Sequence, residues 1–308
     1  MPSQRSATGM GLLALVFWTT SVAVVRQLVA QIGPLTYLAV TSLAAGLLLA
    51  TVQAVRRRRW SACLLFPRKY LLGGGACFVG YFVLFATAHA LAPDHATAVR
   101  LALVNHIWPP LVLLLSVPLL GCRARWPMLL AGVALAVIGA AAGTLREAGP
   151  AGFLRSVAAS PAAFGLMLLA AGAWGAYSNL ARRDHVEGSA SGVPVFLLAT
   201  GVLAGAARGV LGEASRWDGA LTVPLIYACV FPSAVAYSLW EAGMRRGSVP
   251  VLAAASYLLP LGSVLFACWY LGVPPTGNLL AGAALVVAGA VLSRLGIRPP
   301  ADLEELPA

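Results

Sequence analysis

Long apolar runs recur along the whole chain, separated only by short polar connections. Each run is close to the roughly 20 apolar residues that a helix needs to cross a lipid bilayer. The runs are continuously apolar, whereas the strands of a membrane barrel alternate apolar and polar residues over about 10 positions. Helices are therefore expected, and ten runs qualify: 9–30, 34–55, 70–92, 96–120, 127–145, 161–181, 191–211, 220–240, 248–271 and 277–295.

The composition agrees with an all-α membrane protein. Hydrophobic residues fill 60% of the 308 positions and charged residues only 10%, and the mean hydropathy is +0.85. Soluble domains are about half apolar and a quarter charged. Because the connections leave no room for a soluble domain, the expected partners are the lipid bilayer and a small-molecule substrate.

The formal charge of +11 could indicate nucleic-acid binding, but the positions of the basic residues favour a different explanation. With the N-terminus inside, 15 of the 21 basic residues fall on the cytoplasmic side, a bias typical of inner-membrane proteins. We therefore predict a multi-pass protein of the bacterial inner membrane, with both termini cytoplasmic and no nucleic-acid partner. The 15 residues are Arg5, Arg56 to Arg59, Arg68, Lys69, Arg123, Arg125, Arg182, Arg183, Arg245, Arg246, Arg294 and Arg298.

An internal repeat predicts the architecture. The segment LLAGVALAVIG at 129–139 reappears as LLAGAALVVAG at 279–289, an offset of 150 residues. At nearly the same offset, LALVNHIWP at 101–109 aligns with LAAASYLLP at 252–260. A repeat of five crossings must re-enter the membrane upside down. The chain is therefore predicted to form two inverted five-helix repeats, residues 1–148 and 149–308, around a central cavity.

Prolines interrupt two of the matched runs. Pro109 and Pro260 occupy corresponding positions, and matched interruptions are the best sequence sign of a transporter's midplane site. Since proline has no backbone N–H, Pro109 should free the carbonyl of Asn105, and Pro260 that of Ser256. Either these carbonyls receive a substrate ammonium group, or they belong to a packing kink that neighbouring groups satisfy.

Aromatic and polar side chains lie away from the ends of several runs. Trp and Tyr usually form belts at the membrane interfaces, but Trp18, Trp108 and Trp174 lie nearer the middle of their runs. Rings in that position can stack on a flat solute or attract an ammonium group. The predicted substrate-binding residues are Trp18, Tyr81, His89, Asn105, His106, Trp108, Trp174, Tyr177 and Tyr257. Each histidine could instead serve only as a hydrogen-bond donor between helices.

Charged side chains inside the predicted spans are few. Arg26 and Arg100 lie toward the outer ends of spans one and four. Their long side chains either reach the membrane surface or draw carboxylates into an outer vestibule. No Asp or Glu occupies the middle of a span, which counts against a proton-coupled exporter of cationic drugs.

Motifs of a membrane-embedded enzyme are missing from the sequence. It contains neither a Gly-x-Ser-x-Gly element nor a His-Glu-x-x-His element. The five cysteines have no paired spacing. We therefore expect no catalytic residue, no disulfide, no metal site and no cofactor.

A resemblance to a known family rests on four elements: Trp18 followed eight residues later by Arg26, Asn-His-Ile-Trp-Pro at 105–109, Trp174 with Tyr177, and Ser-Tyr-Leu-Leu-Pro at 256–260. From about Gly9 to Gly296 the chain resembles the drug/metabolite transporter superfamily in its EamA-type ten-helix form. Within it, the chain is most similar to the YddG-type aromatic amino acid exporters. His106, where relatives are expected to have tyrosine, and Arg100 depart from that pattern.

This resemblance implies outward movement of phenylalanine, tyrosine, tryptophan and other amino acids. We expect alternating access, with the two halves moving around a midplane site. Ten helices can enclose such a path within one chain, so a monomer suffices. The alternatives are an exporter or facilitator of another small metabolite or aromatic drug cation and, less favoured, a membrane-embedded enzyme. Uniport, exchange and proton coupling all fit the sequence.

Overall fold

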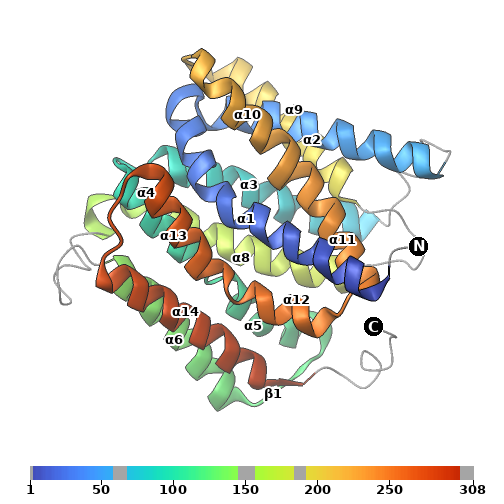
Figure 1. Cartoon of the computed structure of the whole chain (residues 1–308), viewed down its shortest axis with the longest axis vertical. Helices are drawn as coiled ribbons and strands as arrows, with labels where there is room; N and C mark the ends of the chain where they lie inside the picture. The colour runs from blue at the N-terminus through green and yellow to red at the C-terminus, as the bar shows by residue number, and fades with distance from the viewer. Residues whose placement is uncertain (1–2, 58–67, 145–156, 184–191, 299–308) are drawn as a thin grey trace.

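The computed structural model describes residues 3–57, 68–144, 157–183 and 192–298, which are almost entirely helical (Figure 1). The first part of the chain forms α1 (Gln4–Ile32), α2 (Pro34–Arg57), α3 (Gly75–Ala90), α4 (His95–Asn105), α5 (Trp108–Leu120) and α6 (Trp126–Thr144). The second part forms α8 (Pro161–Arg183), α9 (Val193–Leu211), α10 (Thr222–Val230), α11 (Ala236–Arg246), α12 (Val249–Ser256), α13 (Leu259–Leu271) and α14 (Gly277–Leu295).

Short segments of other geometry extend some of these helices. The π-helical segments η2 (Tyr70–Gly74) and η4 (Phe231–Val235) lead into α3 and α11, and the 3-10 turn η3 (Gly219–Leu221) leads into α10. Two short strands, β1 (Arg123–Ala124) and β2 (Ile297–Arg298), pair antiparallel, with Arg123 opposite Arg298. This pairing joins the α5–α6 connection to the segment that follows α14.

Within the described residues, eight helical segments are long and apolar enough to cross a membrane. They contain α1, α2, α3, α4 with α5, α6, α9, α10 with the start of α11, and α14, and they coincide with eight of the ten predicted spans. The other two predicted spans, 161–181 and 248–271, are also helical, as α8 and as the divided pair α12 and α13. The protein is therefore a nearly all-helical, multi-pass membrane protein.

The two spans that contain Pro109 and Pro260 are interrupted just before these prolines. A turn at residues 106–107 separates α4 from α5, and a turn at 257–258 separates α12 from α13. Pro109 and Pro260 lie in the first turn of the second helix, where a helix does not use the N–H that proline lacks. The second helix of each pair ends at a glycine in the left-handed conformation, Gly121 at φ +68° and Gly272 at φ +67°.

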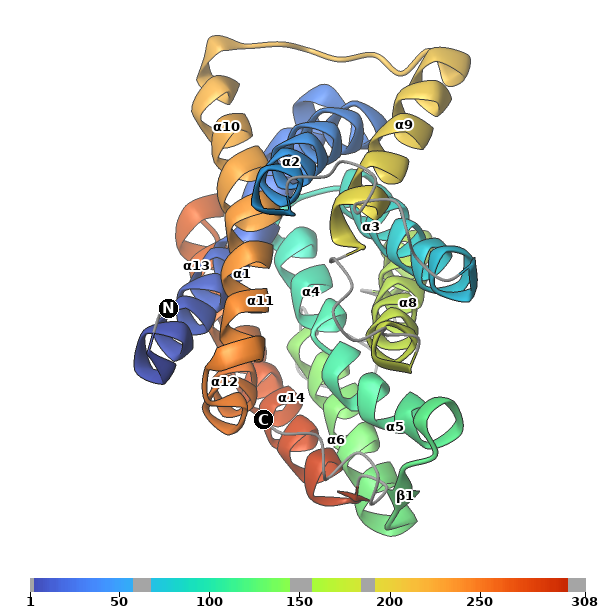
Figure 2. The same cartoon turned by 90° about the vertical axis from the view of Figure 1, so that its right-hand side faces the viewer.

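Two antiparallel helix pairs lie at opposite ends of the bundle (Figures 1 and 2). In the pair α6 and α14, a Cβ on Gly132 would lie 2.7 Å from the carbonyl oxygen of Gly289, and one on Gly139 would lie 2.8 Å from that of Gly282. Partner numbers fall as residue numbers rise, so the helices run in opposite directions. Backbone contact through small residues is a usual way to pack helices in lipid.

The pair α2 and α9 packs in the same sense at the other end. A Cβ on Gly46 would lie 3.0 Å from the backbone nitrogen of Leu198, and one on Gly201 would lie 2.9 Å from that of Leu43. Helices α1, α3, α8 and α11 lie between the two pairs (Figure 2). In this middle layer α1 contacts α11 and α13, and α8 contacts α3 and α5.

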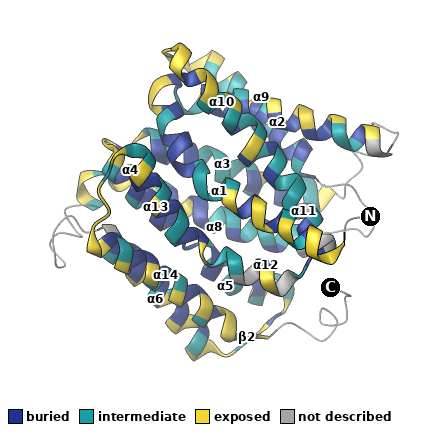
Figure 3. Ribbon diagram, viewed as in Figure 1, coloured by how far each residue is buried: buried dark blue, intermediate teal, exposed yellow. Residues whose placement is uncertain are grey.

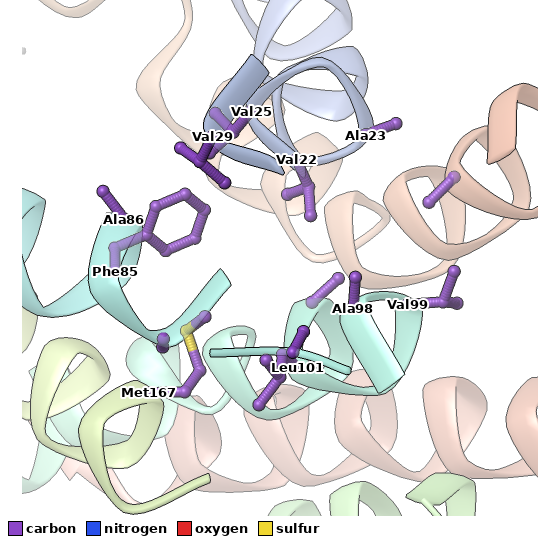
Figure 4. Packing of buried hydrophobic residues seen from close by; sticks show 14 of the residues in the cluster. Val22, Ala23, Val25, Val29, Phe85, Ala86, Ala98, Val99, Leu101 and Met167 are labelled. Atoms are coloured by element: carbon purple, nitrogen blue, oxygen red, sulfur yellow. The ribbon is translucent and has the colours of Figure 1, made fainter. Parts of the chain in front are cut away.

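The largest cluster of buried apolar residues runs from α1 and α3 through α4 and α8 and extends into both outer pairs. The ring of Phe85 on α3 points toward Val25 and Val29 of α1, and Met167 of α8 lies on its other side (Figure 4). Exposed residues lie mainly on the outer faces (Figure 3). Large apolar side chains such as Val210 and Trp269, which are 85% and 76% exposed, suit helices surrounded by lipid.

A polar cluster fastens the α1–α2 turn to the chain that follows α9; we call it the Glu213 clamp. The Glu213 carboxylate accepts hydrogen bonds from the backbone N–H groups of Leu35 (3.0 Å) and Thr36 (2.7 Å), at the N-terminus of α2. The Thr36 hydroxyl also donates to Glu213 (2.8 Å) and accepts from Arg208 Nε (2.7 Å). The negative charge suits the positive end of the helix dipole.

Gly33 allows this arrangement. Its φ of +83° is one that glycine adopts readily, and a Cβ there would lie 2.3 Å from the Glu213 carboxyl carbon. Ser215 completes the clamp by donating to the carbonyl of Ile32 at 2.7 Å, and its oxygen lies 2.8 Å from the hydroxyl oxygen of Thr36.

Candidate functional site

Aromatic side chains from α1, α3, α8 and α11 form one continuous cluster in the middle layer. We call it the central aromatic cluster, and its members are Trp18, Phe78, Tyr81, Trp174, Tyr177 and Tyr237. The ring centroids are 5.4 Å apart for Trp18 and Tyr237, 6.3 Å for Tyr237 and Phe78, 5.0 Å for Phe78 and Tyr177, 5.2 Å for Tyr177 and Trp174, and 4.8 Å for Trp174 and Tyr81. Such separations are those of favourable ring pairs.

Two contacts in the cluster repeat each other. Trp174 on α8 packs against Tyr81 on α3, and Trp18 on α1 packs against Tyr237 on α11. The two tryptophans are 156 positions apart (174 − 18), and so are the two tyrosines (237 − 81). The predicted site included Trp18, Tyr81 and Trp174 but not Tyr237, which this equal spacing could have identified. Phe78 was also missed, and no repeat marks it.

The indole of Trp18 is held in a fixed orientation. Its Nε1 donates a hydrogen bond to the backbone carbonyl of Pro232 at 3.1 Å, inside the π-helical segment η4. The ring centroid of Trp240 lies 5.4 Å from that of the same indole, and the two rings are tilted relative to each other. Trp18 is only partly buried although it lies in the interior of α1, so part of its side chain remains accessible.

Asn105 brings a polar group to the edge of the cluster. It is the last residue of α4, 5% exposed, and its side-chain amide lies beside the phenol of Tyr81. Within the described part of the chain, its Oδ1 has no hydrogen-bond partner. A buried acceptor without a partner costs about 1–3 kcal/mol. It therefore marks a position where a donor from a bound molecule would be favourable.

His89 and Arg26 form a second polar region beyond the cluster. The ring of His89 is fully buried and lies 4.7 Å from that of Phe85, which in turn lies 5.6 Å from Tyr81. Arg26, 7% exposed, donates from Nη1 to the backbone carbonyl of His89 at 2.8 Å. Arg26 Nε and both ring nitrogens of His89 lack hydrogen-bond partners among the residues described.

Three predicted site residues lie apart from the central aromatic cluster. His106 is 5% exposed, and its Nδ1 hydrogen-bonds to the carbonyl of Ala102 at 2.6 Å, in its own chain segment. Trp108 is the first residue of α5 and is partly buried. Tyr257 lies in the turn after α12, within electrostatic range of Arg294. Ring contacts between described residues do not connect Trp108 or Tyr257 to the cluster.

Apolar helices long enough to cross a membrane, enclosing aromatic and polar groups, define a class of protein: multi-pass membrane proteins. In the described ranges, no group of three or more His, Cys, Asp or Glu side chains is placed to hold a metal ion. The profile of the EamA-like transporter family matches residues 5–143 and again residues 161–295. The chain therefore belongs to the EamA-like transporter family, as the resemblance implied, and this membership favours a transporter over an enzyme.

Three known relatives share the name "Aromatic amino acid exporter YddG". The one from Salmonella typhimurium is 28% identical, over 97% of this chain and 99% of its own length, and the one from Escherichia coli K12 is 27% identical, over 96% and 99%. The one from Ancylobacter novellus is 30% identical, over 95% and 98%. A solved crystal structure of 26% identity superposes with a TM-score of 0.66, over 95% of this chain and 98% of the other.

Proposed function

We propose that the protein exports aromatic amino acids across the bacterial inner membrane. The observation that carries this proposal is the likeness, over 95–97% of the chain, to three proteins named as aromatic amino acid exporters. Phenylalanine, tyrosine and tryptophan are the expected substrates, with other amino acids as secondary ones. The central aromatic cluster supports this substrate class because its rings can pack against a flat apolar side chain.

Cluster residues would divide the recognition of such a substrate. Trp18, Tyr81, Trp174 and Tyr177 would contact its ring. The Oδ1 of Asn105, which has no partner among the described residues, would accept a hydrogen bond from a donor on the ring, such as the indole N–H of tryptophan. His106, Trp108 and Tyr257 keep their predicted role only in a conformation that brings them toward the cluster.

Ten membrane crossings in two inverted halves, 1–148 and 149–308, form the architecture that we propose, with both termini cytoplasmic. The glycine contacts support it. An offset of 150 converts the contact of Gly132 with Gly289 into that of Gly282 with Gly139, and an offset of 155 does the same for the pairs of α2 and α9. Both pairs are antiparallel, as inverted halves require.

Helix contacts outside these pairs also occur twice, once from each half. If each helix is replaced by its counterpart in the other half, the contact of α1 with α11 becomes that of α8 with α3, and the contact of α1 with α13 becomes that of α8 with α5. The family profile, too, matches once in each half.

Alternating access is the mechanism that we propose. In both repeated aromatic contacts, Trp18 with Tyr237 and Trp174 with Tyr81, one ring comes from each half. Relative movement of the halves would therefore change both contacts together. A substrate ring inserted between them would bind most strongly while the path is closed on both sides.

Uptake of labelled tryptophan into liposomes that contain the purified protein tests the function. We expect uptake that excess phenylalanine abolishes, and Trp174→Ala should reduce it at least tenfold. Trp217→Ala is the matched control, because Trp217 is 57% exposed in the connection after α9. Repeating the assay with an imposed proton gradient separates facilitation from coupling. Competition by small aliphatic solutes but not by phenylalanine would overturn the aromatic assignment.

A further inference from the structure

Arg26 is a cation buried in the interior of a membrane-spanning helix. Only 7% of its surface is exposed, and charged residues in such positions are rare and usually functional. Its long side chain does not extend to the end of α1. It turns instead toward α3, where Nη1 reaches the carbonyl of His89. In this conformation the Arg26 side chain is therefore held within the protein.

The guanidinium keeps hydrogen-bonding capacity on another edge. Nη1 is occupied by His89, whereas Nε has no partner within the described ranges. Arginine binds carboxylates through parallel N–H groups of this planar fork. The ring of His89 is within electrostatic range of Arg26. Neither of its nitrogens has a partner in the part of the chain described, so the ring offers a further N–H.

The carboxylate of Asp94 is near enough to attract Arg26 but makes no observed hydrogen bond to its Nε. The Oδ1 of Asp94 accepts the N–H of Thr97 at 2.6 Å, which caps the start of α4. The carboxylate of Asp94 is thus held at a helix N-terminus.

The position of Arg26 suits one end of an aromatic amino acid. It lies eight residues after Trp18, about 12 Å along the helix axis. On α3, which faces Arg26, one row of rings leads away from His89. It consists of His89, Phe85 and Tyr81, with ring separations of 4.7 Å (His89 to Phe85) and 5.6 Å (Phe85 to Tyr81). A carboxylate held at Arg26 would therefore direct an attached aromatic ring back toward Phe85 and Tyr81, at the edge of the central aromatic cluster.

We propose that Arg26, together with the ring of His89, is the carboxylate-binding subsite for the exported amino acid. The inference rests on the proposed function, since it assigns the acidic end of the same substrate. Arg26 would act as a specificity-determining residue that separates amino acids from aromatic amines.

The test compares two probes that each lack one charged group of tryptophan. Indole-3-propionate keeps the carboxylate, and tryptamine keeps the ammonium group. Inhibition of labelled tryptophan uptake gives the apparent affinity of each probe for wild type, Arg26→Gln, Arg26→Lys and Arg208→Gln. Where a variant has no uptake, calorimetric titration of the purified full-length protein gives the same affinities.

We expect wild type to prefer indole-3-propionate to tryptamine at least tenfold. Arg26→Gln should bring this ratio close to one, and Arg26→Lys should retain part of it. Arg208→Gln, which removes a cation from the Glu213 clamp, should keep the wild-type ratio. An unchanged ratio in Arg26→Gln, or no preference in wild type, would overturn the inference. Arg26-dependent binding of indole-3-propionate without any tryptophan uptake would overturn the export function and leave the subsite standing.

Discussion

Two polar regions of this apolar molecule use arginine in opposite ways. In the Glu213 clamp, Arg208 meets the hydroxyl of Thr36, and the carboxylate of Glu213 meets two backbone N–H groups of α2. At Arg26, by contrast, one donor meets a carbonyl and Nε has no partner among the described residues. Satisfied polar groups stabilise a fold, whereas buried groups without partners destabilise it. The clamp therefore belongs to the folded structure, and Arg26 is better explained by a bound molecule.

The sharpest way to break this comparison is Arg26→Gln. We expect at least a tenfold loss of tryptophan transport, because hydrogen bonds to a charged group contribute about 1.5–3 kcal/mol. The thermal midpoint should stay within about 2 °C of wild type, since a neutral amide avoids the desolvation cost of a buried, incompletely paired charge. Transport in liposomes and thermal unfolding in detergent measure the two effects. A large fall in the midpoint with intact transport would reverse the roles assigned to the two regions.

Glu213→Ala should give the opposite pattern. It removes three hydrogen bonds at the start of α2, which should lower the unfolding free energy by about 1–3 kcal/mol. Transport per folded molecule should change less than twofold. Arg216→Gln is the matched control, because the Arg216 side chain is exposed and its backbone N–H makes the observed bond to Gln31. Equal unfolding midpoints for Glu213→Ala and Arg216→Gln would contradict the clamp.

Thr36→Val tests the centre of the clamp with little change in shape. It deletes the hydroxyl that donates to Glu213 and accepts from Arg208, and that lies 2.8 Å from the hydroxyl of Ser215. The backbone bond from residue 36 to Glu213 remains, so we expect a loss of about 1 kcal/mol, smaller than for Glu213→Ala. Thermal unfolding of Thr36→Val, Glu213→Ala and the double variant measures the coupling energy between the two side chains. Fully additive losses would show that the two side chains act independently.

His89→Phe is expected to have the smallest effect on stability. No hydrogen bond of the ring is lost, because neither nitrogen has a partner among the described residues, and the contact with Phe85 can be kept. The unfolding midpoint should therefore be equal to or above that of wild type, while transport falls a few-fold through loss of the second N–H. A clear drop in the midpoint would show that the ring nitrogens stabilise the fold.

Much of the fold followed from the sequence, because its dominant signal is local. Hydropathy located the spans that coincide with the eight apolar segments. The repeat also aligned the segments that are interrupted before Pro109 and Pro260. Hydropathy supports a membrane span less strongly at α8, which is not among these eight segments, because Trp174, Tyr177 and Asn179 make its second half less apolar.

Contacts between distant segments explain most of what the sequence did not reveal. Arg26 meets a backbone carbonyl 63 positions away, and Glu213 meets Thr36 across 177 positions. Backbone carbonyls and N–H groups occur at nearly every residue, so the sequence does not indicate which of them a distant side chain will bind. Tyr237 is the exception, because it repeats Tyr81 at the spacing that relates Trp174 to Trp18.

The close contact of α6 with α14 restricts how the proposed halves can move. Gly132 and Gly139 bring the two backbones into close contact, so few side chains lie between the helices that could change rotamer when they move. The pair α6 and α14 would then act as a fixed point about which the halves rotate. The pair α2 and α9, which joins the halves through Gly46 and Gly201 at the other end, would be restricted in the same way, so relative movement of the halves would occur mainly in the middle layer between the two pairs.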